Sequence, residues 1–360
     1  MLQRFTLAAI LCLSLCCLFA SIPGYGQGCV AVRHMSSCTA GSSSALLQKG
    51  HFQASAAYRY FRSDRHFVGR EEQKQRKEQH TEVINVTHAL DLSVTYALTG
   101  RLNATLVLPF ISNDRSSLYE HLGNGSGQRF HTQSRGLGDL RLSVNYWLLD
   151  PLEHLNSNLS IGVGLKAPTG DYRAEDDFVR AEGSVRRPVD QSIQLGDGGW
   201  ATSLELQAFG KIFENGSVYA NAFYMFNPRN TNGVATGRRD SVEVGGIVSV
   251  MSVADQYMAR AGMNYTLLPQ RGLSVSLGGR VEGIPARDLI GKSDGFRRPG
   301  YIVAAEPGLV YMPGKTTVAV NLPVALVRDR IRSVYDIKTG RHGDAAFADY
   351  ALYVTVSQRF

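Results

Sequence analysis

Long stretches of this chain alternate between apolar and polar residues. In residues 81–99, one row holds Val86, Leu90, Leu92, Val94, Tyr96 and Leu98, and the other holds Thr87, Ala89, Asp91, Ser93 and Thr95. Successive side chains of a strand point to opposite faces, so this pattern predicts a β-strand with one apolar and one polar face. The same alternation continues through residues 350–360 up to Phe360.

Twelve segments share this pattern: 51–61, 81–99, 102–110, 136–150, 158–168, 199–213, 217–227, 256–268, 272–283, 301–313, 316–329 and 351–360. Most are longer than the ~5–6 residues of a typical soluble strand. They reach the ~9–11 residues that a tilted strand needs to cross a bilayer. The segments therefore predict either a secreted β-sandwich or a membrane-spanning β-barrel.

The connections between the segments separate these two folds. Short turns alternate with long polar loops, which are residues 63–80, 113–135, 168–197, 228–255, 283–299 and 329–345. Short turns at one end and long loops at the other are typical of outer-membrane barrels. An open sheet edge is not tolerated in lipid, so the last strand must pair with the first. We predict an all-β, transmembrane, antiparallel up-and-down β-barrel of about 12 strands.

One further segment alternates weakly, at residues 241–251. As a thirteenth strand it would move every later short turn to the long-loop end. We therefore place it inside the fourth long loop, as a hairpin arm or a fold into the lumen. A barrel of 14 strands, in which 241–251 pairs with a further strand, is the alternative.

The N-terminus predicts export. An apolar run too short to span a bilayer follows Arg4, and small residues precede a cleavage position after Gly26, so residues 1–26 form a signal peptide. Residues 27–50 then form a periplasmic N-terminal segment, and residues 51–360 form the barrel. In an exported chain, Cys29 and Cys38 favour a small disulfide loop, because a structural zinc site needs four ligands.

Composition excludes several other classes of function. The formal net charge is +7, but the basic residues are scattered and do not form an aromatic-interleaved patch, so nucleic acid binding has little support. The nine histidines show no catalytic or metal-binding spacing. We expect no enzyme activity, no cofactor and no metal, although an outer-membrane hydrolase is a minor alternative.

If the apolar rows face lipid, the polar rows place charges in the lumen. The candidates are five acidic and five basic residues: Asp91, Asp139, Glu205, Glu282, Glu306, Arg141, Lys166, Lys211, Arg260 and Arg280. They could form ion pairs that satisfy buried charge. They could instead form a constriction that selects solutes by charge and size. The balance of signs argues against a strong preference for anions or cations.

The fifth long loop combines charge with turn-forming residues. It carries Asp288, Asp294, Arg297 and Arg298 among glycines and prolines. Such a loop could fold into the barrel mouth as a constriction, with its charges paired to Glu306 or Arg280 beneath. It could also remain a surface loop whose arginines meet solvent or lipopolysaccharide phosphates. The other expected partners are outer-membrane lipid, and the barrel-assembly machinery, which would recognise a C-terminal Phe360.

Several short motifs point to one family. The stretches GLGDLRLSVNY (136–146), GLKAPTGDY (164–172) and EGIPARDLIGKSDGFRRPGY (282–301), with EPGLVY and LPVALVRDR after them, resemble the outer-membrane transporter family of the meta-pathway of phenol degradation. The resemblance runs from about residue 50 to the last residue. It implies a barrel in the bacterial outer membrane that passes small molecules, aromatic ones among them, and it supplies no binding residues. The alternative is a structural or surface-interaction barrel without transport.

Overall fold

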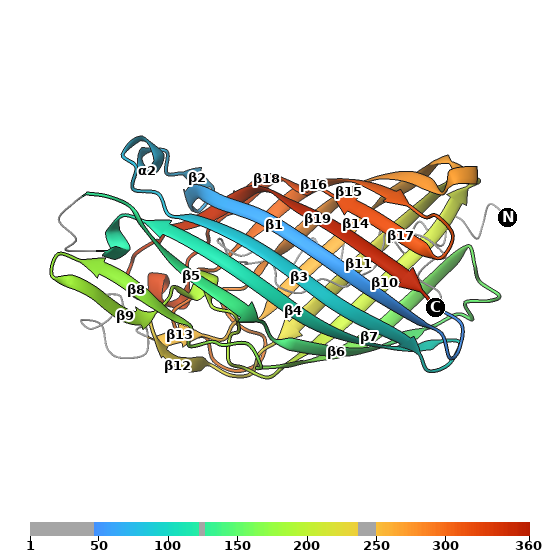
Figure 1. Cartoon of the computed structure of the whole chain (residues 1–360), viewed down its shortest axis with the longest axis horizontal. Helices are drawn as coiled ribbons and strands as arrows, with labels where there is room; N and C mark the ends of the chain where they lie inside the picture. Colours follow the sequence, from blue (N-terminus) through green and yellow to red (C-terminus); the bar gives the residue numbers. More distant parts are fainter. Residues whose placement is uncertain (1–46, 122–126, 237–249) are drawn as a thin grey trace.

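The computed structural model describes residues 47–121, 127–236 and 250–360, which form a closed β-barrel (Figure 1). The expected signal peptide (1–26) and the Cys29–Cys38 pair lie outside the described residues, and so does most of the N-terminal segment 27–50. No helix in the described part of the chain is long and apolar enough to cross a membrane.

Twelve strands form the wall, and each pairs antiparallel with its neighbours. In order they are β1 (Phe52–Val68), β3 (Ile84–Ala97), β4 (Leu102–Ser117), β5 (Phe130–Leu137) with β6 (Leu140–Trp147), β7 (Ser157–Ala167), β10 (Ala201–Phe213), β11 (Gly216–Phe226), β14 (Gln256–Leu268), β15 (Leu273–Ile284), β16 (Gly300–Tyr311), β17 (Thr316–Asn321) with β18 (Val324–Asp329), and β19 (Ala345–Arg359). β19 closes the barrel against β1, from Arg359 opposite Gln53 to Ala345 opposite Phe67. The twelve-strand prediction is confirmed, and the fourteen-strand alternative is wrong.

Two of the twelve strands are interrupted. β17 and β18 are two halves of one strand, separated at Leu322 and Pro323, because proline has no N–H to donate to the ladder. β5 and β6 both pair with β4 and are separated at Gly138 and Asp139, where the Gly138 N–H donates to the carbonyl of Pro109 over 2.8 Å. The sequence pattern did not predict either interruption.

Long loops lie at one end of the barrel, which we take as the external end, and short turns at the other. The short turn between β14 and β15, which contains η6 (Pro269–Arg271), lies at the end opposite the long loops. The external loops contain β2 (Glu71–Glu72), α2 (Gln75–Glu78), η2 (Tyr119–His121), the hairpin of β8 (Glu175–Arg180) and β9 (Gly183–Pro188), η3 (Gln191–Ile193), the hairpin of β12 (Thr231–Ala235) and β13 (Val250–Ser252), and α3 (Val334–Lys338).

Two details of the loops differ from expectation. β1 and β4 run on to Val68 and Ser117, and β5 begins at Phe130, so strands occupy parts of the expected loops 63–80 and 113–135. Alternation fades there because these extensions lie beyond the apolar belt. Within 241–251, Val250 and Met251 belong to the hairpin arm β13, and residues 241–249 lie outside the described residues.

The outer surface carries a belt of exposed apolar side chains, while the inner rows are buried. The belt includes Leu92, Val94, Tyr96, Leu106, Phe110, Leu142, Ile161, Val163, Leu204, Met263, Leu277, Leu309, Leu326, Val356 and Phe360. In water such a surface would be unfavourable, whereas hydrocarbon accommodates it. The apolar rows therefore face lipid and the polar rows face the lumen.

Candidate functional site: the barrel lumen and its external mouth

Four charged side chains meet on the inner wall of β14, β15 and β16. Arg260 Nη1 lies 2.9 Å from Glu306 Oε1, and Arg280 lies 2.8 Å from Glu282 Oε2 and 3.5 Å from Glu306 Oε2. All four side chains are less than a tenth exposed. We call Arg260, Arg280, Glu282 and Glu306 the lumen cluster. Two guanidinium groups and two carboxylates leave it without net charge.

Neighbouring strands hold the lumen cluster in place. Arg260 Nε donates to Asn221 Oδ1 over 3.1 Å, from β14 to β11. Arg280 donates to the Tyr353 hydroxyl over 3.2 Å, and its guanidinium carbon lies 5.0 Å from the centre of that ring. Hydrogen bonds and ring contacts of this kind compensate for the loss of water around buried charges.

Small residues beside the lumen cluster make room for a large one. Tyr219 of β11 lies almost fully buried next to Gly262 and Gly278. A Cβ atom at Gly262 or Gly278 would stand 2.7 or 2.5 Å from the Tyr219 hydroxyl oxygen. The glycines therefore let the tyrosine lie flat against the wall instead of filling the lumen.

The inner wall changes character along its strands. On β14, Met258 lies toward the external end from Arg260, and Asn264 lies toward the periplasmic end. On β1 the order is the same, with Phe61 followed toward the periplasm by Arg59 and Ser55. An apolar cluster of Ala201, Phe223, Met225 and Met258 lies on the external side of this level, and Phe61 and Ala351 pack with Tyr353, which contacts Arg280. Past the mouth, a solute moving along β11 and β14 would meet this apolar surface before the lumen cluster.

The remaining lumen candidates belong to other strands. Asp91 pairs with Arg141 across 2.7 Å. Glu205 is buried on β10, where the Ser203 hydroxyl donates to it over 3.1 Å. Lys211 belongs to the same inner row but is exposed at the periplasmic end of the strand.

Asp139 and Lys166 anchor a loop. Lys166 lies 3.5 Å from Asp139 and forms a second ion pair with Asp197 of the third long loop. Asp139 also accepts hydrogen bonds from the backbone N–H groups of Gly170 and Asp197, at 3.0 and 3.2 Å. Both residues therefore position the third loop at the external end.

The fifth loop is held by its own charges. Arg297 donates two hydrogen bonds to Asp288, at 2.7 and 2.6 Å, and both side chains are 0% exposed. The loop backbone pairs with β13, because the Ser252 N–H donates to Phe296 O over 2.9 Å. Asp294 accepts from Asn230 over 3.4 Å. The expected partners Glu306 and Arg280 instead form the lumen cluster below.

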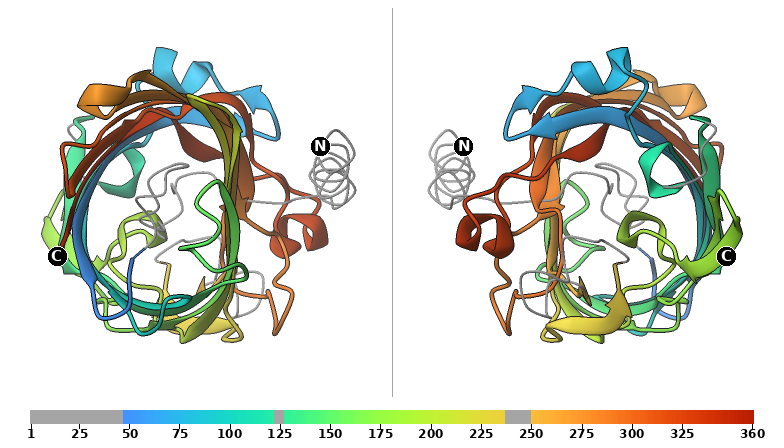
Figure 2. Two further views of the ribbon diagram at one scale, coloured as in Figure 1. Left: turned by 90° about the vertical axis from the view of Figure 1, so that its right-hand side faces the viewer. Right: turned by 90° about the vertical axis from the view of Figure 1, so that its left-hand side faces the viewer.

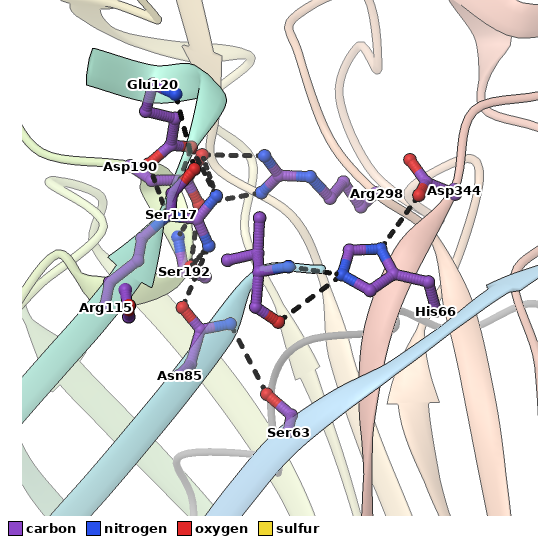
Figure 3. Close-up of polar contacts among 12 residues, drawn as sticks. Ser63, His66, Asn85, Arg115, Ser117, Glu120, Asp190, Ser192, Arg298 and Asp344 are labelled. Atoms are coloured by element: carbon purple, nitrogen blue, oxygen red, sulfur yellow. Dashed lines mark hydrogen bonds and ion pairs between the residues drawn. The ribbon is translucent and has the colours of Figure 1, made fainter. Parts of the chain in front are cut away.

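An ion-pair chain connects opposite sides of the mouth. Arg298 of the fifth loop donates to both carboxylate oxygens of Asp190 in the third loop, at 2.8 and 2.6 Å (Figure 3). Asp190 also lies 3.6 Å from Arg115 on β4. Burial raises the pKa of Asp190, but the two guanidinium groups outweigh burial and hold that pKa well below its ordinary value. We call Arg115, Asp190 and Arg298 the mouth bridge.

Further contacts fix the third loop to the wall. The carbonyl of Ile193 accepts hydrogen bonds from Asn113 of β4, over 3.0 Å, and from Ser134 of β5. Arg115 also donates to Asn85 over 2.8 Å and to Glu120 over 2.5 Å (Figure 3). The third loop thus crosses from its own strands to β4. The sequence analysis missed Arg115 and Asp190, because nothing in their local patterns shows that they meet.

A second polar contact lies at the external end of β1 and β19. His66 Nδ1 is 2.8 Å from Asp344 Oδ2 (Figure 3). Arg76 Nη2 is 2.8 Å from the same oxygen. Burial raises the pKa of Asp344, but the His66 hydrogen bond and the nearby positive charges outweigh it and lower that pKa to about 2. Asp344 therefore ties the sixth loop to the first as an anion.

Among the described residues, no group of three or more His, Cys, Asp or Glu could hold a metal ion. Their polar contacts are ion pairs and hydrogen bonds within the protein. The inner wall and mouth therefore offer a lining for a solute and a barrier across the entrance.

Comparison with known proteins identifies the fold. No family model matches the chain, and no curated protein matches it. The chain is similar to an outer-membrane channel from Pseudomonas putida F1, with a TM-score of 0.60, 17% identity, and coverage of 91% of this chain and 100% of that one. The fold is therefore that of an outer-membrane channel.

Weaker similarities extend to two toluene transporters. These are TbuX of Ralstonia pickettii, with a TM-score of 0.42, 12% identity and coverage of 94% and 99% of the two chains, and TodX of P. putida, with 0.40, 10%, 87% and 90%. The resemblance to the phenol-degradation family stays a prediction.

Proposed function

We propose that this protein is an outer-membrane channel through which small apolar or aromatic molecules pass. The observation that carries the proposal is the two-part lining of a closed barrel. On β11 and β14, apolar side chains such as Phe223 and Met258 lie on the external side, and the neutral lumen cluster follows. The fold of a known channel supports it.

This lining suits an uncharged, partly apolar solute. Apolar surface inside the mouth gives such a molecule a favourable environment after it leaves water. Beyond it, a cluster with no net charge offers hydrogen-bonding groups but no strong attraction for an ion. A charged solute would have to disturb the buried pairs of Arg260 and Arg280, which is costly.

A liposome-swelling panel tests the proposal. The full chain, folded into liposomes, should admit small aromatic alcohols faster than sugars of similar size, and faster than aromatic acids. A structural or surface-interaction barrel without transport would give no swelling above that of empty liposomes with any solute. Equal rates for all solutes would leave a channel but overturn its apolar preference.

Two methionines of one strand provide a matched comparison. Met258 of β14 faces the lumen and is 3% exposed, whereas Met263 of the same strand faces lipid and is 49% exposed. Met258→Ser should slow the aromatic solute several-fold while leaving the sugar rate within about twofold. Met263→Ser should change neither rate. Slowing of all solutes alike by Met258→Ser would point to a narrowed or distorted barrel.

A further inference from the structure

Two external loops extend sideways beyond the barrel wall. We define the fifth loop as residues 285–299 and the sixth loop as residues 330–344. Viewed along the barrel, α3 of the sixth loop and part of the fifth loop lie outside the ring of strands, next to β15 and β16 (Figure 2). Lys338 of α3 lies 3.8 Å from Asp294, which connects the two loops. Whatever lies outside the ring at this end lies over the membrane lipid and not over the pore.

The overhanging loops expose aliphatic side chains. Leu289 and Ile290 of the fifth loop are 69% and 55% exposed, and Ile337 of α3 is 56% exposed. Three such residues are unfavourable in water. At the boundary between headgroups and acyl chains they gain an apolar environment. Their position and their exposure therefore fit contact with the outer leaflet.

The same loops expose positive charge while neutralising their acids internally. Asp288 is buried against Arg297, and Asp336 lies 2.9 Å from the buried Arg330. Arg287, Lys292 and Arg332 are exposed. The exposed surface of these two loops is therefore both basic and aliphatic.

We propose that the exposed surface of the fifth and sixth loops binds the phosphorylated, multiply acylated glycolipid of the outer leaflet. Arg287, Lys292 and Arg332 would contact its phosphates, since guanidinium and ammonium groups form charge-assisted hydrogen bonds with phosphate oxygens. Leu289, Ile290 and Ile337 would contact its acyl chains.

The first loop has only one of these two features, exposed positive charge. It carries exposed cations at Lys74, the N-terminal cap of α2, and at Lys77 within α2. Between residues 69 and 83, however, no large apolar side chain is exposed. The first loop thus has charge without aliphatic surface and serves as an internal comparison for the binding test.

Binding can be measured by native mass spectrometry of the folded full chain in zwitterionic nanodiscs, with diphosphorylated lipid A as the probe. The variant R287Q/K292Q/R332Q should bind lipid A at least about tenfold more weakly, since each cation near a phosphate surface contributes appreciably. L289S/I290S/I337S should also weaken binding. The control K74Q/K77Q/R186Q removes the same charge from the first and third loops and should stay within about twofold of wild type.

Other probes identify the chemistry. Lipid A without phosphates and deacylated lipid A should each bind more weakly than the intact lipid, and inorganic phosphate should not displace it. Displacement by inorganic phosphate would overturn a lipid site in favour of a simple anion site. If the test and control variants weaken lipid A binding equally, the effect comes from overall charge, and the proposed lipid site is also overturned. Heat-modifiable migration of each variant shows that the barrel itself is intact, so the result does not depend on the transport proposal.

Discussion

The barrel wall and the external mouth are held together by different forces. β15 pairs with β16 without interruption, from Leu273 opposite Tyr311 to Ile284 opposite Gly300. In the mouth, Arg298 reaches Asp190, 108 residues away in the sequence, through side chains alone. Backbone ladders in hydrocarbon have no competing water, whereas ion pairs at the mouth can be exchanged for water. The wall should therefore be permanent and the mouth adjustable.

One part of the wall resembles the mouth. Where β18 meets β19, Val324 opposite Tyr350 is the pair through which the two strands join. Above it, Arg328 Nε donates to the carbonyl of Ala348 over 3.1 Å, and Arg328 also pairs with Asp349. Side chains thus replace the backbone ladder beyond Pro323. Where this strand is interrupted, side-chain contacts therefore hold it to its neighbour in place of backbone hydrogen bonds.

The largest effect should come from the wall. Phe360 is 49% exposed, its N–H donates to Phe52 O over 2.9 Å, and its ring stacks on Phe52 at 4.6 Å. Deleting Phe360 removes a closing contact and the residue that we expect the assembly machinery to read. Folded barrel in the outer membrane should fall several-fold, while export to the periplasm continues. Quantitative heat-modifiability assays of membrane fractions measure this loss.

A second phenylalanine gives the control for that deletion. Phe213, at the periplasmic end of β10, is also 49% exposed. Phe213→Ala should leave assembly close to wild type, because it removes similar apolar surface without touching the closing strand. If both changes lower assembly equally, Phe360 acts through its apolar area and carries no signal.

A smaller effect is expected from the mouth bridge. Asp190→Asn keeps the shape of the side chain but removes the charge that Arg115 and Arg298 share. The third and fifth loops should separate more often, so single-channel conductance should rise about twofold or more without loss of folded barrel. Arg298→Gln should do the same, and the double variant should add little, because both changes break one contact.

An exposed ion pair tests whether neutralising any charge at the external end would raise the conductance. Arg70 and Asp329 pair at 3.0 Å on the outer side, with Arg70 largely exposed. Asp329→Asn should leave conductance unchanged. Equal conductance in wild type and Asp190→Asn would mean that the mouth bridge does not limit the path.

The smallest effect concerns pH. Because the pKa of Asp344 falls from its ordinary 3.8 to about 2, its contribution is present above about pH 4 and is lost as pH falls toward 2. The shift corresponds to about 2 kcal/mol of local stability. Proteolysis of the sixth loop should therefore stay constant from about pH 8 to 5 in wild type. Asp344→Asn should accelerate it throughout that range, and an identical rate in the variant would contradict the assignment.

The sequence predicted the wall well because strand alternation is local. Leu92, Val94 and Tyr96 reveal their lipid-facing row without knowledge of any partner strand. The alternation of short turns and long loops indicates that the number of strands is even. The sequence also placed Arg260, Arg280, Glu282 and Glu306 on inner rows, but their pairing depends on the register of three strands. The sequence did not predict the role of Asp190, since its partners come from β4 and the fifth loop. Side-chain contacts between distant loops have no periodic signal.

The central claim is that the closed barrel conducts, and single-channel recording in planar bilayers tests it most directly. The purified full chain should give discrete current steps, larger in Asp190→Asn than in wild type and unchanged in Asp329→Asn. Folded, heat-modifiable protein that produces no steps in any of the three forms would contradict the account.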